Sequence, residues 1–317
     1  MISERFRRVL SKAFQRAVKT IWWIFKITVS VSFAMLLLKY TGMLRWIAVA
    51  VSPVFSLFGL PGDASMAYVS GYFINVYSCV AVITTLDLTA REITILGTMT
   101  LAAHAMILES TVQHKTGTPT AYVVVVRTVA SLALGILLNL ILPGRPEMTS
   151  SAALPLSEVP LFQIQGRFMP LFVEWLWNMA RLTVWMVVLI LFLNVLQRTL
   201  YEYGIMEKIA HFFNPLLRVF GLDGSTSFLW IVANVAGLSY GSAAIMDEIE
   251  RGNTDPYSIN LLNTHVGVSH SNLEDLMLLS AIGGTWYVIL LSRWAIVTVL
   301  VWMVRLLKPK FLLGETS

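Results

Sequence analysis

The sequence predicts an all-α integral membrane protein built from two inverted-topology repeats, each with a re-entrant hairpin and a broken helix. Only 13% of its 317 residues are charged, about half of the ~25% found in soluble domains, so most of the chain must lie in lipid. Several apolar runs approach the ~20 residues that cross a bilayer. The clearest cover residues 21–38, 122–143, 171–196 and 286–307. In addition, a set of polar and glycine-containing motifs recurs in the same order in both halves of the chain.

Residues 1–20 are predicted to form an amphipathic helix on the cytoplasmic membrane surface. Six basic residues of this segment interleave with apolar residues at helical spacing, as in helices that lie in the membrane interface. Basic residues elsewhere collect near the ends of apolar runs, as positive-inside sorting requires. The net charge of +5 therefore does not indicate nucleic-acid binding.

Two membrane repeats are predicted at residues 21–143 and 171–307, joined by a polar linker at residues 144–170 and followed by a cytoplasmic tail at residues 308–317. Matching residues follow one another in the same order in both repeats, which is the signature of an internal duplication. The matched pairs are Pro53 with Pro215, Gly59 with Gly221, Gly62 with Gly224, Ser65 with Ser227, His104 with His270, Glu109 with Asp275, Gly117 with Gly283 and Arg127 with Arg293.

Each repeat is predicted to cross the membrane three times, because a long span is followed by a hairpin and two further spans. The short segments 43–58 and 65–85, with a glycine-containing turn between them, suggest a hairpin that enters and leaves on the same side. An odd number of crossings inverts the second repeat. With the N-terminus inside, fourteen basic residues lie on the inner side and five outside, which favours six crossings and two cytoplasmic termini.

Two polar segments at matching places are predicted to line a cavity. Residues 257–284 are too polar for a lipid-facing helix, and residues 104–115 show the same feature in the first repeat. Ionisable groups at membrane depth are costly and usually face a pathway; a loop at the aqueous face is the alternative. Inversion would bring matching places together near the midplane. The candidate substrate- or ion-binding residues are His104, Glu109, Ser110, His265, His270, Ser271, Asn272, Glu274 and Asp275.

Arg127 and Arg293 lie in otherwise apolar runs. We expect them to pair with a buried carboxylate, such as Glu109 or Asp275, rather than to reach the surface. His270 and Glu274 are four residues apart, a spacing that can bind a metal from one helix face. Such side chains in a transport cavity are more often hydrogen-bonding groups, so no resident metal or other cofactor is predicted.

The hairpin tips GLPGDAS and GLDGSTS are a second candidate for a binding site. Glycine permits the tight turn, and Asp63 or Ser65 in one tip and Ser225 or Thr226 in the other could cap the following helix. A helix N-terminus that faces inward attracts anions or polar groups, while an ordinary interhelical turn is the alternative. The tip residues are Gly59, Gly62, Asp63, Ser65, Gly221, Gly224, Ser225 and Ser227.

These stretches resemble the nucleoside recognition or Gate-domain family, which includes spore maturation proteins A and B, the membrane gate of the ferrous iron transporter B and part of the concentrative nucleoside transporters. The similar stretches are YTGMLRWIAVAVSPVFSLFGLPGDAS with LAAHAMILESTVQHKTG, and YGIMEKIAHFFNPLLRVFGLDGSTS with THVGVSHSNLEDLMLLSAIGG. The resemblance implies two inverted repeats and a substrate site where the hairpins meet the broken helices. The Gly-Phe-Gly-Cys gate motif and the Gln-Ser/Thr-Glu hairpin signature of some members are absent from this sequence.

The sequence therefore predicts a secondary transporter or permease for a small polar solute, nucleoside-like or otherwise, in the bacterial inner membrane. Coupling to H⁺ or Na⁺ would use Glu109, Glu274 and Asp275. The alternatives are a non-transporting component that supports envelope or sporulation-type assembly, and a divalent metal ion permease. No nucleophile triad or nucleotide-binding fingerprint is visible, so an enzyme is not predicted. The expected partners are the solute, a coupling ion and the lipid bilayer, and a homo-oligomer is compatible with the sequence.

Overall fold

The computed structural model describes residues 28–144, 166–252 and 254–309, together with residues 18, 21, 22, 25, 26, 164 and 312. These residues form helices and turns and include no strand, which confirms the predicted all-α class. Most of the predicted N-terminal amphipathic helix, of the linker and of the C-terminal tail lies outside the described residues.

The first half of the chain is a series of helices interrupted at short breaks. A helix at Thr28–Thr41 turns sharply at Gly42 into the next one, with an angle of 94°. The helices that follow are α2 (Met43–Phe55), η1 (Ser56–Phe58), α3 (Ala64–Phe73), α4 (Val76–Ile83), α5 (Ala90–Ala103), α6 (Met106–Lys115) and α7 (Thr120–Ile141).

The second half has the same order of elements. Its first helix, α8, begins at Phe168 and so includes the last residues of the predicted linker. Pro170 does not prevent this, because proline is tolerated in the first turn of a helix. The helices are α8 (Phe168–Glu202), α9 (Ile205–Val219), η4 (Gly224–Thr226), α10 (Ser227–Val235), α11 (Leu238–Glu250), α12 (Pro256–Ser269), α13 (Glu274–Ala281) and α14 (Trp286–Leu307).

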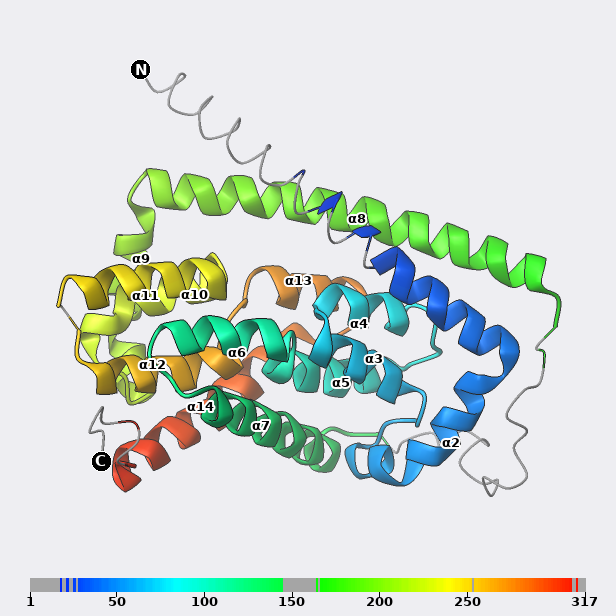
Figure 1. Cartoon of the computed structure of the whole chain (residues 1–317), viewed down its shortest axis with the longest axis horizontal. Helices are drawn as coiled ribbons and strands as arrows, with labels where there is room; N and C mark the ends of the chain where they lie inside the picture. Colours follow the sequence, from blue (N-terminus) through cyan, green and yellow to red (C-terminus); the bar gives the residue numbers. More distant parts are fainter. Residues whose placement is uncertain are drawn as a thin grey trace, which may run out of the picture.

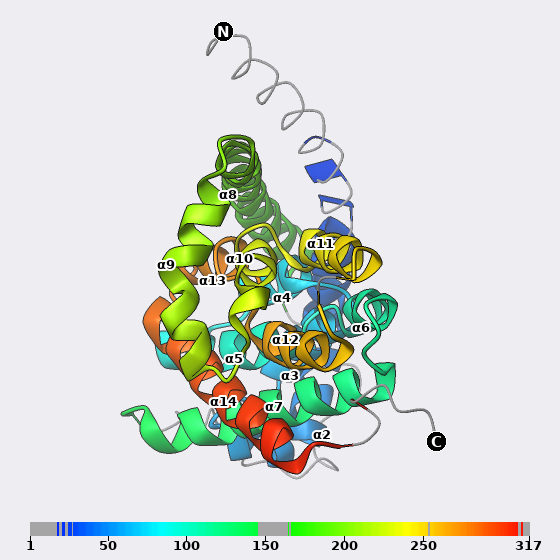
Figure 2. The same ribbon diagram turned by 90° about the vertical axis from the view of Figure 1, so that its left-hand side faces the viewer.

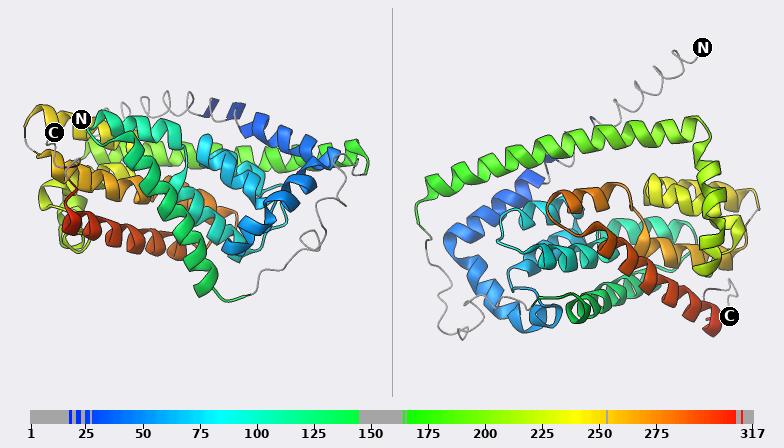
Figure 3. Two further views of the ribbon diagram at one scale, coloured as in Figure 1. Left: turned by 60° about the horizontal axis from the view of Figure 1, so that its bottom comes forward. Right: turned by 180° about the vertical axis from the view of Figure 1, so that it is seen from behind.

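The two halves pack against each other through matching elements. α5 packs on its counterpart α12 at the centre. α5 also contacts α14 of the second half, and α12 likewise contacts α7 of the first half. In the same way, α4 contacts α13 and α11 contacts α6. In Figure 1, α7 and α14 cross below the central helices, α8 runs along the top, and α2 and α9 lie at opposite ends. The end-on and rear views agree with this arrangement (Figures 2 and 3). Reciprocal contacts of this kind are typical of two copies related by a two-fold axis.

Four described helical stretches are long and apolar enough to cross a membrane: Ala90–Lys115, Thr120–Ile141, Phe168–Glu202 and Trp286–Leu307. The bent pair Thr28–Thr41 and Met43–Phe58 would add a fifth. These stretches support a multi-pass membrane protein, whereas the sixth crossing and the inversion of the second half stay predictions.

The central stretch differs from the other three in its surroundings. In the most apolar 18 residues of Ala90–Lys115, 83% of the residues are buried inside the molecule, against 22–33% in the other three stretches. The outer helices can therefore present apolar surface to lipid, while α5 is enclosed by protein. α6 is only partly covered, because Ile107 and Leu108 are exposed. The apolar core consists of two clusters; one includes Leu96 and Met99 from α5, and the other includes Leu262 and Val266 from α12.

Candidate functional site

Each half contains a long helical stretch that is interrupted at a histidine. α5 and α12 end immediately before His104 and His270, whose backbones are extended, with ψ of 162° and 178°. The next residues, Ala105 and Ser271, have φ values of 43° and 55°, a left-handed conformation that residues with a Cβ rarely adopt. Strain of this kind persists only where the surrounding structure holds it and clusters at functional sites.

Arg127 of α7 holds the first break in place. Its Nε donates to the carbonyl of Ala102 at 3.1 Å, and its Nη2 donates to the carbonyl of His104 at 2.8 Å. Nη2 also lies 2.6 Å from Oε2 of Glu109. Arg127 is buried and has the carboxylate partner that the sequence suggested for it.

Arg293 of α14 holds the second break in the same way. Its Nε donates to the carbonyl of Val268 at 2.8 Å, and its Nη2 donates to the carbonyl of His270 at 2.7 Å. Its third contact differs, because Nη1 donates to the amide oxygen of Asn272 at 3.3 Å. Among the described residues Arg293 forms no ion pair with Asp275, so the expected carboxylate partner is replaced by a neutral amide.

The side chains at the two breaks meet at one carboxylate oxygen. Nε2 of His104 lies 3.1 Å and Nε2 of His270 lies 3.0 Å from the same Oε1 of Glu109. Oδ2 of Asp275 lies 3.5 Å from His104 Nε2, and the two imidazole rings are 4.9 Å apart between centres. We call His104, Glu109, His270 and Asp275 the central cluster; each half contributes one histidine and one acid.

The neighbouring acid Glu274 does not join the central cluster. Its Oε1 accepts a hydrogen bond from the hydroxyl of Tyr77 in α4. The helix-face pairing of His270 with Glu274 suggested by their spacing is therefore not formed; His270 contacts Glu109 of the other half instead.

Two residues near the cluster were not predicted from the sequence. Tyr77 contacts Glu274, and Asn234 of α10 accepts a hydrogen bond from the side-chain amide of Asn272 at 2.6 Å. Both lie beside a break in the helical segment that follows the tip: Tyr77 comes after Asn75, between α3 and α4, and Asn234 comes before Gly237, between α10 and α11. The sequence does contain a signal for both: each is a polar residue in an apolar run and lies two or three residues from an asparagine or a glycine that can interrupt a helix.

The remaining predicted polar residues lie around the cluster in different roles. Ser110 is buried and donates to the sulfur of Met106. His265 lies in an aromatic group, where its Nδ1 accepts from the indole of Trp230 at 3.1 Å and its ring lies 4.6 Å from that of Phe220. These contacts account for His265 as a core side chain.

The hairpin tips have matching backbone geometry. Gly59 and Gly221 have φ values of 64° and 76°, so each turn uses the left-handed region that glycine allows. The carbonyl of Gly59 accepts from Arg91 at 3.4 Å and that of Gly221 from Arg305 at 2.9 Å. Both tips are thus fixed to helices of their own half.

The predicted capping of the helices after the tips is wrong in detail. Asp63 occupies the N-cap of α3 without a side-chain capping bond, and Thr226 precedes α10 without one. The side chain that caps the second turn is Asp223, which accepts from the backbone N–H of Ser225 at 3.0 Å. Ser227 instead donates to the carbonyl of Gly224.

The tips are also distant from the central cluster. The Gly59 tip contacts Asn139, which lies twelve residues after Arg127 in α7, and the Gly221 tip contacts Arg305, twelve residues after Arg293 in α14. Twelve residues of α-helix span about 18 Å. The hairpin residues that contact neighbours of the cluster are Tyr77 in the first turn of α4 and Asn234 in the last turn of α10, not the glycine turns.

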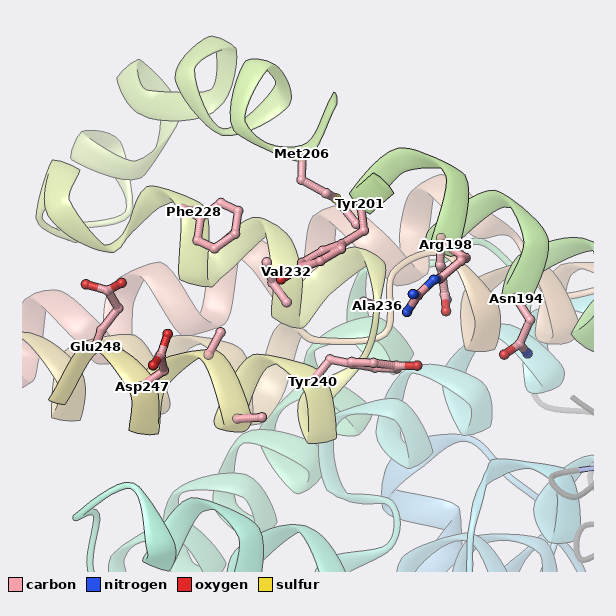
Figure 4. Close-up of a pocket in the computed structure, with 13 residues that line it drawn as sticks. Asn194, Arg198, Tyr201, Met206, Phe228, Val232, Ala236, Tyr240, Asp247 and Glu248 are labelled. Carbon is pink, nitrogen blue, oxygen red and sulfur yellow. The ribbon is translucent and has the colours of Figure 1, made fainter. Parts of the chain in front are cut away.

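A cavity of about 390 Å³ lies between α8, α9, α10 and α11. Figure 4 shows Asn194, Arg198 and Tyr201 on α8 and Tyr240, Asp247 and Glu248 on α11 around it. Its volume falls within the ~300–1,000 Å³ of small-molecule sites. Its lining combines aromatic, aliphatic and polar side chains.

Comparison with known proteins gives a family match in the first half of the chain. Residues 21–140 match the Gate family model, whose description is nucleoside recognition. This part of the chain is therefore similar to Gate domains. The matched part contains His104, Glu109 and Arg127, and the second half carries His270, Asp275 and Arg293 at the corresponding places.

A membrane protein of Bacillus subtilis (strain 168), YvoD, described as uncharacterized, is 25% identical to the chain over 275 residues. The match covers 87% of each chain, so the similarity extends beyond residues 21–140 into the second half. No solved structure matches the chain significantly. The family match and this relative support a multi-pass membrane protein.

Proposed function

We propose that the chain is a secondary transporter or permease for a small polar solute in the bacterial inner membrane, coupled to H⁺ or Na⁺. One observation carries the proposal: the ionisable side chains of the central cluster come from both halves and meet at a single buried point. An ionised side chain at membrane depth costs ~2.5–3.5 kcal/mol on insertion scales. Apolar side chains could hold the halves together without that cost, so the cluster favours a role in solute passage.

The helix breaks provide further support for transport. Broken helices offer backbone groups and helix ends to a polar guest at the contact between two repeats. Nη1 of Arg127 is buried and has no acceptor among the described residues. Buried donors of native proteins are usually paired, so this N–H is available to a guest beside Glu109.

The cavity beside α8 is the proposed entrance. Gln197 of its wall donates to the carbonyl of Val235 at 2.9 Å, and the preceding residue, Asn234, contacts Asn272 next to the cluster. The last turn of α10 thus separates the cavity from the central cluster. Gly237, with φ of 90° and no atom within 4 Å of the position that a Cβ would take, is the hinge that we expect to move when the solute passes.

The proposed topology is tested by reporter fusions. If each half crosses three times, the segment between the halves is outside and the C-terminus is inside. Fusions of a periplasm-specific and a cytoplasm-specific reporter after Ser151 and after Ser317 should therefore report opposite sides. The same side for both fusions would contradict an inverted second half.

The role of the acids is tested by conservative amide variants. Glu109→Gln and Asp275→Asn should abolish uptake into proteoliposomes, because an amide cannot change its charge during the transport cycle. The solute is first found by a thermal-shift screen of purified protein against nucleosides, divalent metals, phosphate and carboxylates. Uptake of the positive compounds is then measured with and without proton and sodium gradients.

The matched control is Glu250→Gln, an exposed acid at the end of α11, which should transport normally. Unfolding curves of all variants show whether the protein stays folded. If Glu109→Gln and Asp275→Asn transport like wild type, the transport role of the cluster is wrong. If the variants lose only folding stability, the cluster has a structural role and holds the two halves together.

A further inference from the structure

The tautomers of the two central histidines follow from their backbone contacts. Nδ1 of His104 lies 3.2 Å from the carbonyl of Leu101, and Nδ1 of His270 lies 2.7 Å from the carbonyl of Val266. A carbonyl only accepts, so each Nδ1 must carry a proton. In the neutral ring the lone pair is then on Nε2, and it is Nε2 that points to Glu109 from both sides.

This arrangement brings acceptors together. Oε1 of an ionised Glu109 and two neutral Nε2 atoms are three acceptors within 4.8 Å of one another, and acceptors without a positive charge between them repel. To turn both contacts into hydrogen bonds takes two added protons, and at least one ring is then charged beside the other ring, 4.9 Å away between centres, and beside the guanidinium of Arg127. A single cation satisfies all three acceptors with both rings neutral.

The distances from Glu109 Oε1 to the two Nε2 atoms fit a transition-metal site. Tetrahedral ligands about 2.0–2.1 Å from a Zn²⁺ ion lie about 3.3 Å from one another. The two distances to Glu109 Oε1, 3.1 and 3.0 Å, are within a few tenths of an ångström of this. Imidazole ligands favour ions such as Zn²⁺, Cu²⁺, Fe²⁺ or Ni²⁺, whereas Ca²⁺ and Mg²⁺ prefer sites made of oxygen.

The groups behind the three ligands resemble those of metal sites. A metal-bound histidine commonly donates its other N–H to a carbonyl or carboxylate, which fixes the ring, and both rings here do so. Glu109 is oriented by Arg127 through its other oxygen at 2.6 Å. Asp275, 3.5 Å from His104, is placed to become a fourth ligand.

We propose that His104, Glu109 and His270 bind one divalent transition-metal ion, with Asp275 as a fourth ligand. Each half of the chain supplies at least one ligand, so the ion bridges the two helix breaks. The role of the ion rests on the proposed function. If the chain is a transporter, the polar solute is a metal cation that passes between the two halves. Binding itself needs no transport and is measured on its own.

The test uses the purified full-length chain in detergent after removal of metals with a chelator. Zn²⁺, Mn²⁺, Co²⁺, Mg²⁺ and Ca²⁺ are titrated separately by calorimetry, and bound metal is counted by mass spectrometry after desalting. We expect one equivalent of Zn²⁺ or Co²⁺ per chain and no binding of Mg²⁺ or Ca²⁺. The absorption spectrum of bound Co²⁺ reports nitrogen and oxygen ligands in a low-coordinate site.

Variants of the ligands decide the location of the ion. His270→Asn and Glu109→Gln should weaken Zn²⁺ binding by at least ~100-fold, because ligand loss exceeds the 10–100-fold effect of outer contacts. His114→Ala and His211→Ala remove exposed histidines and should bind as wild type does. If a ligand variant unfolds, the Co²⁺ spectrum of wild type and the two exposed controls still decide the matter.

Three results would overturn the metal assignment: no stoichiometric ion on wild type, equal binding of Mg²⁺, or loss of binding in the exposed-histidine variants alone. Proteoliposome uptake separates this from the proposed function. Stoichiometric Zn²⁺ binding without uptake would retain the site and reject transport. Uptake of another solute by a chain that binds no metal would reject only the metal site.

Discussion

Replacing Arg127 with methionine is expected to lower the free energy of unfolding by about 3–5 kcal/mol, the cost of breaking a buried ion pair by removing one partner. The variant leaves Glu109 buried without its cation, and it leaves the carbonyls of Ala102 and His104 without their donor. The loss is measured by denaturant unfolding of the purified protein in mixed micelles.

Arg251 provides the matched control, because it pairs with Asp247 at 2.7 Å while its side chain is 61% exposed. Arg251→Met should cost less than about 1 kcal/mol, as exposed pairs contribute little. Arg127→Lys should fall between the two, since an ammonium keeps the charge but cannot reach three oxygens with a planar fork. Equal losses for Arg127→Met and Arg251→Met would show that Arg127 does not hold the break.

Gly62→Ala is the second substitution with a large expected effect. A Cβ at Gly62 would collide with the carbonyl oxygen of Ala48 in α2 and would lie 2.9 Å from its Cα. Because the obstacle is backbone, α2 and α3 must separate to make room. We expect a loss of stability at or above the upper end of the ~1–3 kcal/mol typical of overpacking, visible as a lower unfolding midpoint and reduced yield of folded protein.

Gly252→Ala distinguishes crowding from backbone strain. Gly252 has φ of 70°, and no atom lies within 4 Å of the position that a Cβ would take. Alanine there therefore costs only the penalty of a left-handed backbone conformation, about 1–2 kcal/mol. Gly62 has no such penalty, because its φ lies outside the left-handed region. A Gly62→Ala variant that is as stable as Gly252→Ala would mean that the α2–α3 hairpin is looser than the structure indicates.

The class of the fold was predictable because it depends on local composition. Apolar runs of membrane length and few charges require helices in lipid, since lipid leaves no partner for exposed backbone. The order of matched residues likewise indicated that both halves would repeat one pattern. The start of α8 at Phe168 was missed, because polar residues and Pro170 were interpreted as linker although proline fits the first turn.

The individual contacts of the site were less predictable, because they join residues far apart in the sequence. Glu109 bonds to His270 across 161 positions, and Tyr77 to Glu274 across 197. No periodicity within a segment encodes such pairs; they depend on how the helix breaks of the two halves pack. Sequence spacing therefore paired His270 with Glu274, its neighbour along a helix, whereas packing gave it the acid of the other half.

The reciprocal packing of the halves has a consequence for the origin of the chain. An ancestor of half this length could have formed a symmetric homodimer with the whole cluster, because His104, Glu109 and Arg127 have counterparts in His270, Asp275 and Arg293 at one constant interval. In such a dimer both acids would have had to be identical. A single chain has no such restriction: here Glu109 contacts both histidines, the corresponding acid is the shorter Asp275, and Arg293 contacts the amide of Asn272. A chain with two halves can therefore hold an asymmetric centre that a symmetric homodimer cannot.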